Sequence, residues 1–433
     1  MNTTTLTSSA QSPPRARIRT RDSLWVLFFA IIYAVVTLKV LTGNYISRNI
    51  FFSVYSVAIT LYIFSRFLLA YLHRSVPIAK NFEPSIAFVV PAKNEEDNIY
   101  ETIKRFGEVD YPKDKIEVIA INDGSTDGTG DEMRRAAHDI GDKVARVEVV
   151  DWKDNRGKRH GMHEGTIRAR HDVIIFIDSD SFIEKTTVRH LVKYFTDPRI
   201  GAVSGHTDVY NRDTNLLTKM QSLRYYVSFR VYKSAESVFG AVTCSPGCCS
   251  AYRRDYLTEF IDEWLHQTFL GAACTFGDDR ALTNYILQKY KAVYSLEAKA
   301  YTVVPDNFRQ YLKQQQRWKK SWVRETFLAS GFMWRRHPWA APFFYLYFLL
   351  AFVAPLVFIY AVIVNPILFG VIPFVYFGGL FLMLLLHGTY YRIYVDEPNW
   401  IYAVFGFWLY SIILMWQLPW AVVTVTDTSW GTR

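Results

Sequence analysis

Hydrophobic residues are concentrated toward both ends of the chain, and charged residues are concentrated in the middle. Long apolar runs lie at residues 24–41, 50–72, 340–386 and 399–426. The third run contains no Asp, Glu, Lys, Arg or His. At ~1.5 Å per helical residue it is roughly 70 Å long, about two crossings of a ~30 Å hydrocarbon core. Because helices of soluble proteins keep a polar face, these runs predict an integral membrane protein.

Basic residues beside the apolar runs indicate how the spans are oriented. They precede the first run, follow the second and precede the third: Arg15, Arg17, Arg19, Arg21, Arg74, Lys80, Arg335 and Arg336. Since cytoplasmic flanks carry an excess of Lys and Arg, these flanks and residues 82–330 are predicted to be cytosolic. The net charge of +9 needs no nucleic-acid partner, because much of it lies beside anionic membrane lipids.

The middle segment begins with apolar strands that alternate with helical stretches. The strands are predicted at residues 85–90, 116–121, 147–150 and 173–177. Largely apolar strands, most of them followed by a helix, indicate a parallel sheet covered on both faces. Polar residues follow directly after the strands, where ligands bind in open α/β sheets. The chain has no GxGxxG or GxxxxGK[ST] motif, so neither a dinucleotide fold nor a P-loop is indicated.

Two polar clusters suit a nucleotide diphosphate. Asp123 lies in an Asp-Gly-Ser turn at the end of a predicted strand. Its carboxylate can accept hydrogen bonds from a uracil or a ribose, or it can close the loop as an Asx turn. Residues 155–159 (NRGKR) place several cations and a flexible glycine in one loop. Such a loop suits a diphosphate, although basic loops are commonly just solvated.

Asp178 and Asp180 alternate at the end of another predicted strand. Two like charges at the edge of an apolar sheet repel unless they share a cation. Mg²⁺ or Mn²⁺ that also binds diphosphate oxygens is the natural resolution, so this pair predicts a metal site. The alternative is that Asp180 or Ser181 caps a helix.

The four cysteines lack zinc-type spacing and are predicted to be reduced thiols.

The order NDGSTD, NRGKR and DSD resembles the family 2 inverting glycosyltransferases of GT-A fold. Three later motifs are similar to the acceptor loop, the catalytic-base motif and the QxxRW motif of processive members: CSPGCCSAYR at residues 244–253, GDDR at 277–280 and QQQRW at 314–318. Those members include cellulose, chitin, hyaluronan and rhizobial chitooligosaccharide synthases. GDDRALTNYIL, QQQRWKKSWVRE and the final WGTR look most like hyaluronan synthases. The acceptor loop departs from the SGPLGMYR of that group and looks closer to chitin synthases.

The resemblance implies an α/β GT-A domain with a doubly wound, mostly parallel sheet, placed in the cytosol between transmembrane helices. It implies transfer of sugar from UDP-GlcNAc, possible alternation with UDP-GlcA, and a growing polysaccharide as acceptor. Asp279 matches the carboxylate that deprotonates the acceptor hydroxyl. The alternative is that Asp279 belongs to a structural ion-pair group that includes its neighbours Asp278 and Arg280.

The remaining site residues follow from their motif positions. The donor-binding residues implied are Asp123, Lys158, Arg159, Asp178, Asp180, Gln314, Arg317, Trp430 and Arg433, with Asp178 and Asp180 as ligands of Mg²⁺ or Mn²⁺. The acceptor-binding residues implied are Cys248, Cys249, Tyr252 and Trp318. Trp318 stacks a sugar ring in this interpretation; otherwise it is an interfacial tryptophan.

The expected segments are a basic tail (1–22), two transmembrane helices (23–75), the GT-A domain (82–305), amphipathic interface helices with QxxRW (306–336), a transmembrane region (338–426) and a tail (427–433). If residues 399–426 crossed the membrane once, the tail would end outside, away from the donor. Pro419 breaks a helix near Leu418. We therefore expect a kinked or re-entrant final segment that leaves Arg433 on the cytosolic side.

Other functions remain open on the sequence alone. A chitin or chitooligosaccharide synthase would carry the same motifs. A transferase that loads one sugar onto a polyprenyl phosphate would share the donor motifs and the C-terminal spans, but would not be expected to carry QxxRW. A non-catalytic transporter or sensor is disfavoured by the complete set of motif residues: Asp123, Asp178, Asp180, Asp279 and Arg317.

Overall fold

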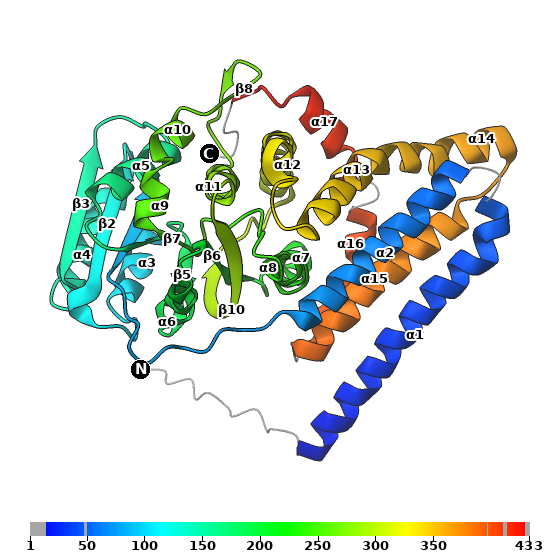
Figure 1. Ribbon diagram of the computed structural model, residues 1–433, viewed down its shortest axis with the longest axis horizontal. Helices are drawn as coiled ribbons and strands as arrows, with labels where there is room; N and C mark the ends of the chain where they lie inside the picture. Colours follow the sequence, from blue (N-terminus) through cyan, green and yellow to red (C-terminus); the bar gives the residue numbers. More distant parts are fainter. Residues whose placement is uncertain (1–13, 47–49, 396, 410–413, 429–433) are drawn as a thin grey trace, which may run out of the picture.

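The computed structural model describes residues 14–46, 50–395, 397–409 and 414–428. Figure 1 shows an α/β domain on one side and long helices on the other. The domain contains an eight-stranded sheet in the order β3-β2-β1-β4-β7-β6-β10-β5. The strands are β1 Ile86–Ala92, β2 Ile116–Asp123, β3 Arg146–Trp152, β4 Val173–Phe176, β5 Ser181–Ile183, β6 Ile200–Val209, β7 Ser250–Arg253 and β10 Lys291–Thr302. A separate hairpin pairs β8 Thr268–Phe269 with β9 Ala272–Ala273.

The predicted parallel sheet is present in the first half of the domain. The four predicted strands are β1 to β4, and they pair in parallel in the order β3-β2-β1-β4. The second half is mixed: β7 is antiparallel to β4 and β6, and β5 is antiparallel to β10. All residues of β1 and β2 are buried, as expected for strands covered on both faces.

Helices cover both faces of the sheet and produce two apolar cores. Phe88 and Val89 are neighbours on β1, and their side chains enter different cores because successive strand residues point to opposite faces. The Phe88 core is covered by α3 Ile99–Phe106, α4 Thr129–Ile140 and α6 Thr187–Val192, and the Val89 core by α5 Lys158–Arg168, α10 Ile261–Leu265 and α11 Asp278–Leu287. The short helix α9 Arg254–Thr258 follows β7.

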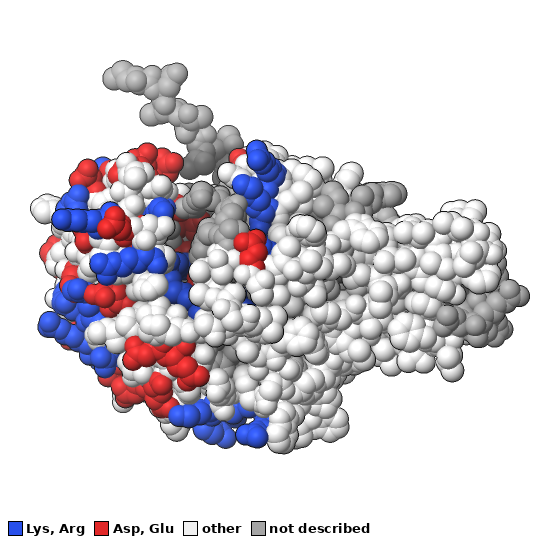
Figure 2. Space-filling view, turned by 90° about the horizontal axis from the view of Figure 1, so that it is seen from above, with Lys and Arg blue, Asp and Glu red and all other residues white. Residues whose placement is uncertain are grey.

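Within the described residues, four helices are long and apolar enough to cross a membrane. These segments are Arg21–Leu41 of α1 (Pro14–Ile46), α2 Ile50–Leu72, Ala340–Phe369, and α15 Phe374–Tyr394. The third combines α13 Ala340–Ile359, a π-helical turn Tyr360–Val364 and α14 Asn365–Phe369. Figure 2 shows charged side chains gathered over the α/β domain and a largely uncharged surface over the long helices. The first three predicted apolar runs therefore form spans of membrane length.

The start of α1 and the end of α15 lie at the same end of the helix bundle, beside the α/β domain. The Arg21 guanidinium lies 6.0 Å from the ring centroid of Tyr394. Just after α15, Glu397 forms a 2.6 Å ion pair with Arg212 of the domain. Between them, α7 Leu216–Val227, the π-helix Ser228–Lys233 and α8 Ser234–Ser237 connect the domain to the bundle.

In the described part of the last apolar run, which omits residues 410–413, the helices are short. They are η5 Pro398–Tyr402, α16 Ala403–Leu409 and α17 Gln417–Val423. Pro419 lies in the first turn of α17, where proline is tolerated, so it does not end a helix near Leu418 as expected. Figure 1 shows α17 beside the 26-residue helix α12 Phe308–Met333, which it contacts. Trp430 and Arg433 lie outside the described residues.

Candidate active site

Asp178 and Lys158 form an ion pair at the carboxyl edge of the sheet. Asp178 follows β4, and Lys158 is the first residue of α5. The Lys158 ammonium donates to Oδ1 of Asp178. Burial alone would lower the pKa of Lys158, but Asp178, Asp278 and Asp279 outweigh burial and raise it. Lys158 therefore stays protonated at neutral pH beside three carboxylates.

Asp180 lies in the same turn and carries a second carboxylate. Burial and the neighbouring Asp178 raise the pKa of Asp180 to about 6. The hydroxyls of Ser181 and Thr302 each lie 3.5 Å from its Oδ1. Residues Ser181–Ile183 form strand β5, so the alternative that Asp180 or Ser181 caps a helix is wrong. The single positive charge of Lys158 neutralises one of the two carboxylates, Asp178. The carboxylate of Asp180 can therefore still bind a cation.

The pair fits a divalent metal ion that a ligand helps to bind. The described residues contain no group of three or more His, Cys, Asp or Glu side chains arranged to hold a metal. The chain would therefore contribute only Asp178 and Asp180, leaving the other positions to diphosphate oxygens and water. Mg²⁺ is bound in this way in many phosphate-processing enzymes, through one or two carboxylates plus substrate oxygens.

Asp123 anchors the loop that leads to Lys158. Its Oδ1 accepts a 2.6 Å hydrogen bond from the Arg156 N–H, and its Oδ2 accepts a 2.9 Å bond from the Gly157 N–H. The turn itself is closed by Asn122, which accepts from the Ser125 N–H. The loop-closing alternative for Asp123 is thus observed, through the N–H groups of Arg156 and Gly157. Contact of Asp123 with a nucleotide stays a prediction.

Arg159 is used inside the domain. Its guanidinium donates to Asp278 at 2.7 Å, to the Trp264 carbonyl at 2.8 Å and to Gln267 at 3.1 Å. The side chain is only 4 % exposed. Because all three nitrogens have partners within the fold, we assign Arg159 a framework role joining α5 to α11, and we leave it out of the proposed donor site.

Asp279 is at the N-terminus of α11, where the helix dipole stabilises a negative charge. The helix begins after Gly277, whose φ of +76° is accessible to glycine at little cost. Asp278, rather than Asp279, forms the ion pair with Arg159. Oδ1 of Asp279 accepts from the Arg280 N–H at 2.8 Å, and its Oδ2 lies 3.7 Å from the Cys244 sulfur.

The loop at residues 244–249 lies between these two carboxylate groups. Cys244 contacts Asp279, and the Cys248 sulfur lies 3.6 Å from Oδ2 of Asp178. Sequence reasoning overlooked Cys244, although it opens the CSPGCCSAYR motif. Cys249 and Tyr252 are fully buried in the sheet core, so the part of this loop that faces the site is residues 244–248.

Helix α12 brings the QQQRW motif to the same place. Burial lowers the pKa of Arg317, while Asp278, Asp279 and Asp178 act on it in the opposite direction. Trp318 is 39 % exposed, and its ring centroid lies 6.2 Å from that of Tyr225. Oε1 of Gln314 is buried without a hydrogen-bond partner within the described part of the chain. Lys158, Asp178, Asp279 and Arg317 thus come together from four separate segments.

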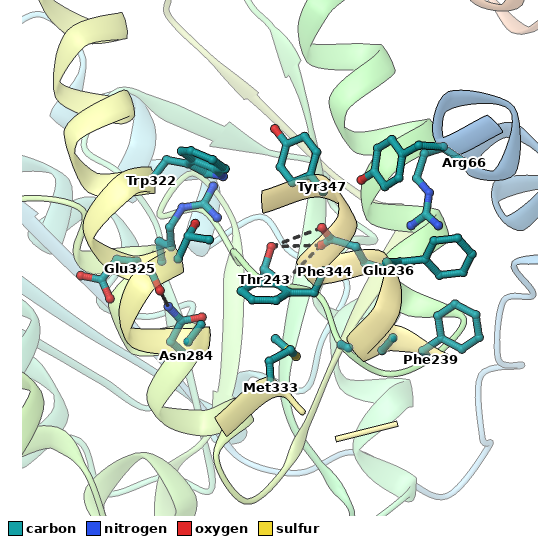
Figure 3. A pocket seen from close by; sticks show the side chains of 17 residues that line it. Arg66, Glu236, Phe239, Thr243, Asn284, Trp322, Glu325, Met333, Phe344 and Tyr347 are labelled. Atoms are coloured by element: carbon teal, nitrogen blue, oxygen red, sulfur yellow. Dashed lines mark hydrogen bonds between the residues drawn. The ribbon is translucent and has the colours of Figure 1, made fainter. Parts of the chain in front are cut away.

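A small cavity of about 50 Å³ lies on the membrane side of α11. Its lining comes from α2, α8, α11, α12 and α13, and includes Arg66, Glu236, Arg280, Trp322 and Tyr347. Figure 3 shows Trp322, Tyr347, Glu236 and Arg66 gathered around it, with Glu236 bonded to Thr243. Arg280 follows Asp279 directly, so the cavity begins one residue from that carboxylate.

Comparison with known proteins places these features in context. The family model "Glycosyl transferase family 2" matches residues 87–261. A hyaluronan synthase of Streptococcus pyogenes is 27% identical over 422 residues, covering 95% of this chain and 97% of that protein. An N-acetylglucosaminyltransferase of Azorhizobium caulinodans is 35% identical over 251 residues, or 57% of this chain and 62% of that protein. Among solved structures, the mannosyltransferase PcManGT from Pyrobaculum calidifontis, in complex with GDP-Man and Mn²⁺, has a TM-score of 0.58 at 21% identity. It covers 87% of this chain and 99% of its own length, and it shares the fold.

Proposed function

Because this membrane protein belongs to the family 2 glycosyltransferases, as its motif order predicted, we propose that it transfers sugar from a UDP-sugar to a growing polysaccharide. The donor would be UDP-GlcNAc, alternating with UDP-GlcA if the product is hyaluronan-like. The observation that carries the proposal is the meeting of Lys158, Asp178, Asp279 and Arg317 around the loop at residues 244–248.

Lys158 and Arg317 are the cations that face the diphosphate. Lys158 stays charged because carboxylates surround it, and the guanidinium of Arg317 has no accessible neutral form near pH 7. Asp178 and Asp180 would hold Mg²⁺ or Mn²⁺, which when bound neutralises charge on the diphosphate. Trp430 and Arg433 are proposed to bind the donor as well. In support, the described chain ends at Thr428, whose carbonyl accepts a 2.6 Å bond from Thr275, a short distance from Asp279.

Asp279 acts as the general base in this proposal. Its carboxylate takes the proton of the acceptor hydroxyl while that oxygen bonds to the anomeric carbon of the donor sugar. The bond from that carbon to the diphosphate breaks in the same step, and UDP leaves with the electron pair. Attack from the side opposite the leaving group inverts the anomeric configuration.

The acceptor is proposed to lie along α12. Trp318 offers an exposed indole face on which a sugar ring can stack. Trp322 lies one turn further along the same helix face and lines the cavity described above. We place the path of the growing polymer from Trp318 into this cavity, between α2, α12 and α13. That path leads from the base directly toward the spans and suits a processive enzyme that passes its product across the membrane.

The domain is proposed to face the cytosol, where nucleotide sugars are available. The basic flanks of the spans support this orientation. Arg21 lies near Tyr394, and Glu397 forms an ion pair with Arg212 of the domain. These contacts support placing the start of α1, the end of α15 and the domain on the same side of the membrane.

A second candidate is a transferase that uses GlcNAc alone, such as a chitooligosaccharide synthase. The similarity to an N-acetylglucosaminyltransferase favours it, with 35% identity over 251 residues against 27% over 422 residues for a hyaluronan synthase. The acceptor loop SPGCCSAYR points the same way.

The test is product analysis with the purified full-length protein in lipid nanodiscs. It is supplied with radiolabelled UDP-GlcNAc, Mg²⁺ or Mn²⁺, and UDP-GlcA present or absent. High-mass polymer that requires both donors supports the hyaluronan-like function, and polymer or oligomer from UDP-GlcNAc alone supports the second candidate. Label that extracts into organic solvent as a glycolipid contradicts both. Absence of UDP release under every condition contradicts the proposed enzyme.

A further inference from the structure

The loop that precedes Asp279 is held in place residue by residue. The Arg324 guanidinium donates to the carbonyl of Phe276. Gly277 packs against the Ser321 side chain so closely that any Cβ at position 277 would collide with it. Asp278 accepts from Arg159, as described above. Two of these contacts come from α12, the helix that also carries Arg317 and Trp318.

The first residue of this loop is held by the C-terminal end of the described chain. The Thr275 hydroxyl donates a 2.6 Å hydrogen bond to the carbonyl of Thr428. The adjacent Asp427 forms a 2.7 Å ion pair with Lys320. Lys320 is only 7 % exposed and directly precedes Ser321 on α12. A buried ammonium needs a partner, so this ion pair ties the C-terminal end to α12, next to the serine that packs on Gly277.

Residues 414–428 are here called the C-terminal strap. The strap makes further contacts along α12. The Lys319 ammonium donates to the Leu414 carbonyl. The Gln417 amide donates to the Leu312 carbonyl at 3.1 Å. The Gln316 amide lies 3.2 Å from both the Gln417 carbonyl and the Ala421 N–H, and it bonds to both when its nitrogen faces the carbonyl and its oxygen faces the N–H. The strap comprises the end of the last apolar run and the two residues after it, so it connects that run to the loop that precedes Asp279.

We propose that the Lys320–Asp427 ion pair and the Thr275–Thr428 hydrogen bond are positioning contacts for Asp279. Through them the C-terminal strap completes the clamp on residues 275–278 and sets where the carboxylate of Asp279 stands. The inference rests on the proposed role of Asp279 as base. Lys320 and Asp427 do not touch the substrate in this account; they act through the loop. Their function is to couple the position of the final membrane segment to the transfer step.

The contacts explain why a substitution of Lys320 or Asp427 would shift the carboxylate of Asp279. Oδ1 of Asp279 accepts from the N–H of its own neighbour Arg280, so the carboxylate moves with the first turn of α11. Release of Thr275 frees the chain three residues before that turn begins. A misplacement of about 1 Å at a reacting group can cost as much as a hundredfold in rate.

The test compares Lys320→Met, Lys320→Arg and Asp427→Asn, with Lys313→Met as the matched control. Lys313 is an exposed lysine on the same helix. We expect kcat to fall about tenfold or more in Lys320→Met and Asp427→Asn. The KM for UDP-GlcNAc and the Kd for UDP should change much less than kcat, because Lys158, Asp178 and Arg317 keep their positions and only the contacts proposed for Trp430 and Arg433 follow the strap. Lys320→Arg should keep most of the activity, since it restores the ion pair.

Hydrogen exchange measured by mass spectrometry supplies a readout that does not depend on activity. Peptides that contain residues 275–280 should exchange faster in Lys320→Met and Asp427→Asn than in the wild type and in Lys313→Met. The amides of β1 and β2 should be unchanged, which shows that the domain is folded. Asp427→Asn keeps the test usable if Lys320→Met fails to fold, because Asp427 is half-exposed.

Either of two results overturns the inference. Exchange of residues 275–280 that stays at the wild-type rate shows that the strap does not hold the loop. Faster exchange with an unchanged kcat shows that the strap does not position the base. If the wild-type protein releases no UDP from any donor, the proposed function fails by itself, and the exchange measurement still decides whether the strap clamps the loop.

Discussion

Gly247 packs so closely against Asp178 that a Cβ at position 247 would lie 2.5 Å from the Oδ1 atom of that carboxylate. The same Cβ would lie 3.0 Å from the Lys158 ammonium. The loop at residues 244–248 therefore reaches the Lys158–Asp178 ion pair because a glycine occupies this one position. Similarity to the acceptor loop of processive synthases predicted that the loop belongs to the site, and its contact with Lys158 and Asp178 is a finding of the structure.

Gly247→Ala should therefore weaken UDP binding by about tenfold or more, because the ion pair must shift to make room. The measurement is the Kd for UDP with Mn²⁺, by titration calorimetry. Gly331→Ala is the matched control: it lies in α12 with open space around its Cβ position, and should leave binding unchanged. In a helix interior this control should also stabilise the fold by about 0.5–1 kcal/mol. Equal UDP affinity in both variants would contradict the close contact.

The raised pKa of Asp180 predicts a specific pH dependence of metal binding. Below pH 6 a proton occupies the carboxylate and competes with the cation, since the pKa is about 6 instead of 3.8. Mn²⁺-dependent UDP binding should weaken by up to about tenfold per pH unit below 6 and level off above it. Calorimetry between pH 5 and pH 8, a range of about three units around that pKa, measures this. Asp180→Asn should abolish the Mn²⁺ dependence at every pH, and a variant that keeps it would remove Asp180 from the metal site.

The raised pKa of Asp180 also predicts how the stability of the fold depends on pH. The folded state holds the proton of Asp180 more tightly than the unfolded chain does, because the folded pKa is the higher one. Without a cation, the contribution of this group to stability is complete at low pH and is lost as pH rises through about 6. A bound divalent cation offsets this loss, so Mn²⁺ should raise Tm more at pH 7 than at pH 5, which are about one unit on either side of that pKa.

The first half of the fold was predictable because its strands are short apolar runs followed by polar residues and, for β1 to β3, a helix. Predicted residues 116–121 became β2 Ile116–Asp123, and predicted residues 173–177 became β4 Val173–Phe176. Strands β6, β7 and β10 did not stand out, since their pairing depends on partners far along the chain. The GT-A fold inferred from the motif order is confirmed by the family match and by the solved mannosyltransferase.

The site was predictable in its residues more than in their contacts. The motifs named Lys158 and Asp178, but nothing in the local sequence showed that the two form an ion pair. Arg159 follows Lys158 in the same basic loop, yet the first turn of α5 directs it into the domain, toward Asp278. Composition alone cannot show which of two neighbouring cations enters the site and which enters the domain, because helix geometry decides where each side chain points.

Trp318→Ala should reduce chain extension more than hydrolysis of the donor, because stacking holds the acceptor and not the nucleotide. The measurement is the ratio of polymer formed to UDP released at saturating donor. Trp334→Ala is the control, since Trp334 is 60 % exposed at the far end of α12. We expect a fall of about tenfold in the ratio for Trp318→Ala, as a lost stacking contact is worth about 1–3 kcal/mol. An equal loss of both activities would indicate that Trp318 is structural.

Thiol reagents should inhibit slowly and through Cys248. Burial, then Asp178 and Asp180, raise the pKa of the Cys248 thiol well above its ordinary value, and little thiolate is present at pH 7. Cys249 faces the sheet core and is out of reach. The rate of inactivation by a maleimide should keep rising up to about pH 9 and beyond, because the thiolate fraction grows throughout that range. Cys248→Ser should be resistant, and equal sensitivity of that variant would place the reactive thiol elsewhere.

The central claim is that Asp279 is the base of a sugar transfer whose donor binds beside Lys158 and Arg317. Its most direct test is Asp279→Asn, measured for UDP release from UDP-GlcNAc and for UDP affinity in the same preparation. The account predicts that transfer falls by about a hundredfold or more, since base catalysis typically contributes 10²–10⁴ in rate. The Kd for UDP should stay within about threefold, because the donor contacts remain. Transfer at the wild-type rate, or loss of UDP binding together with transfer, would contradict the account.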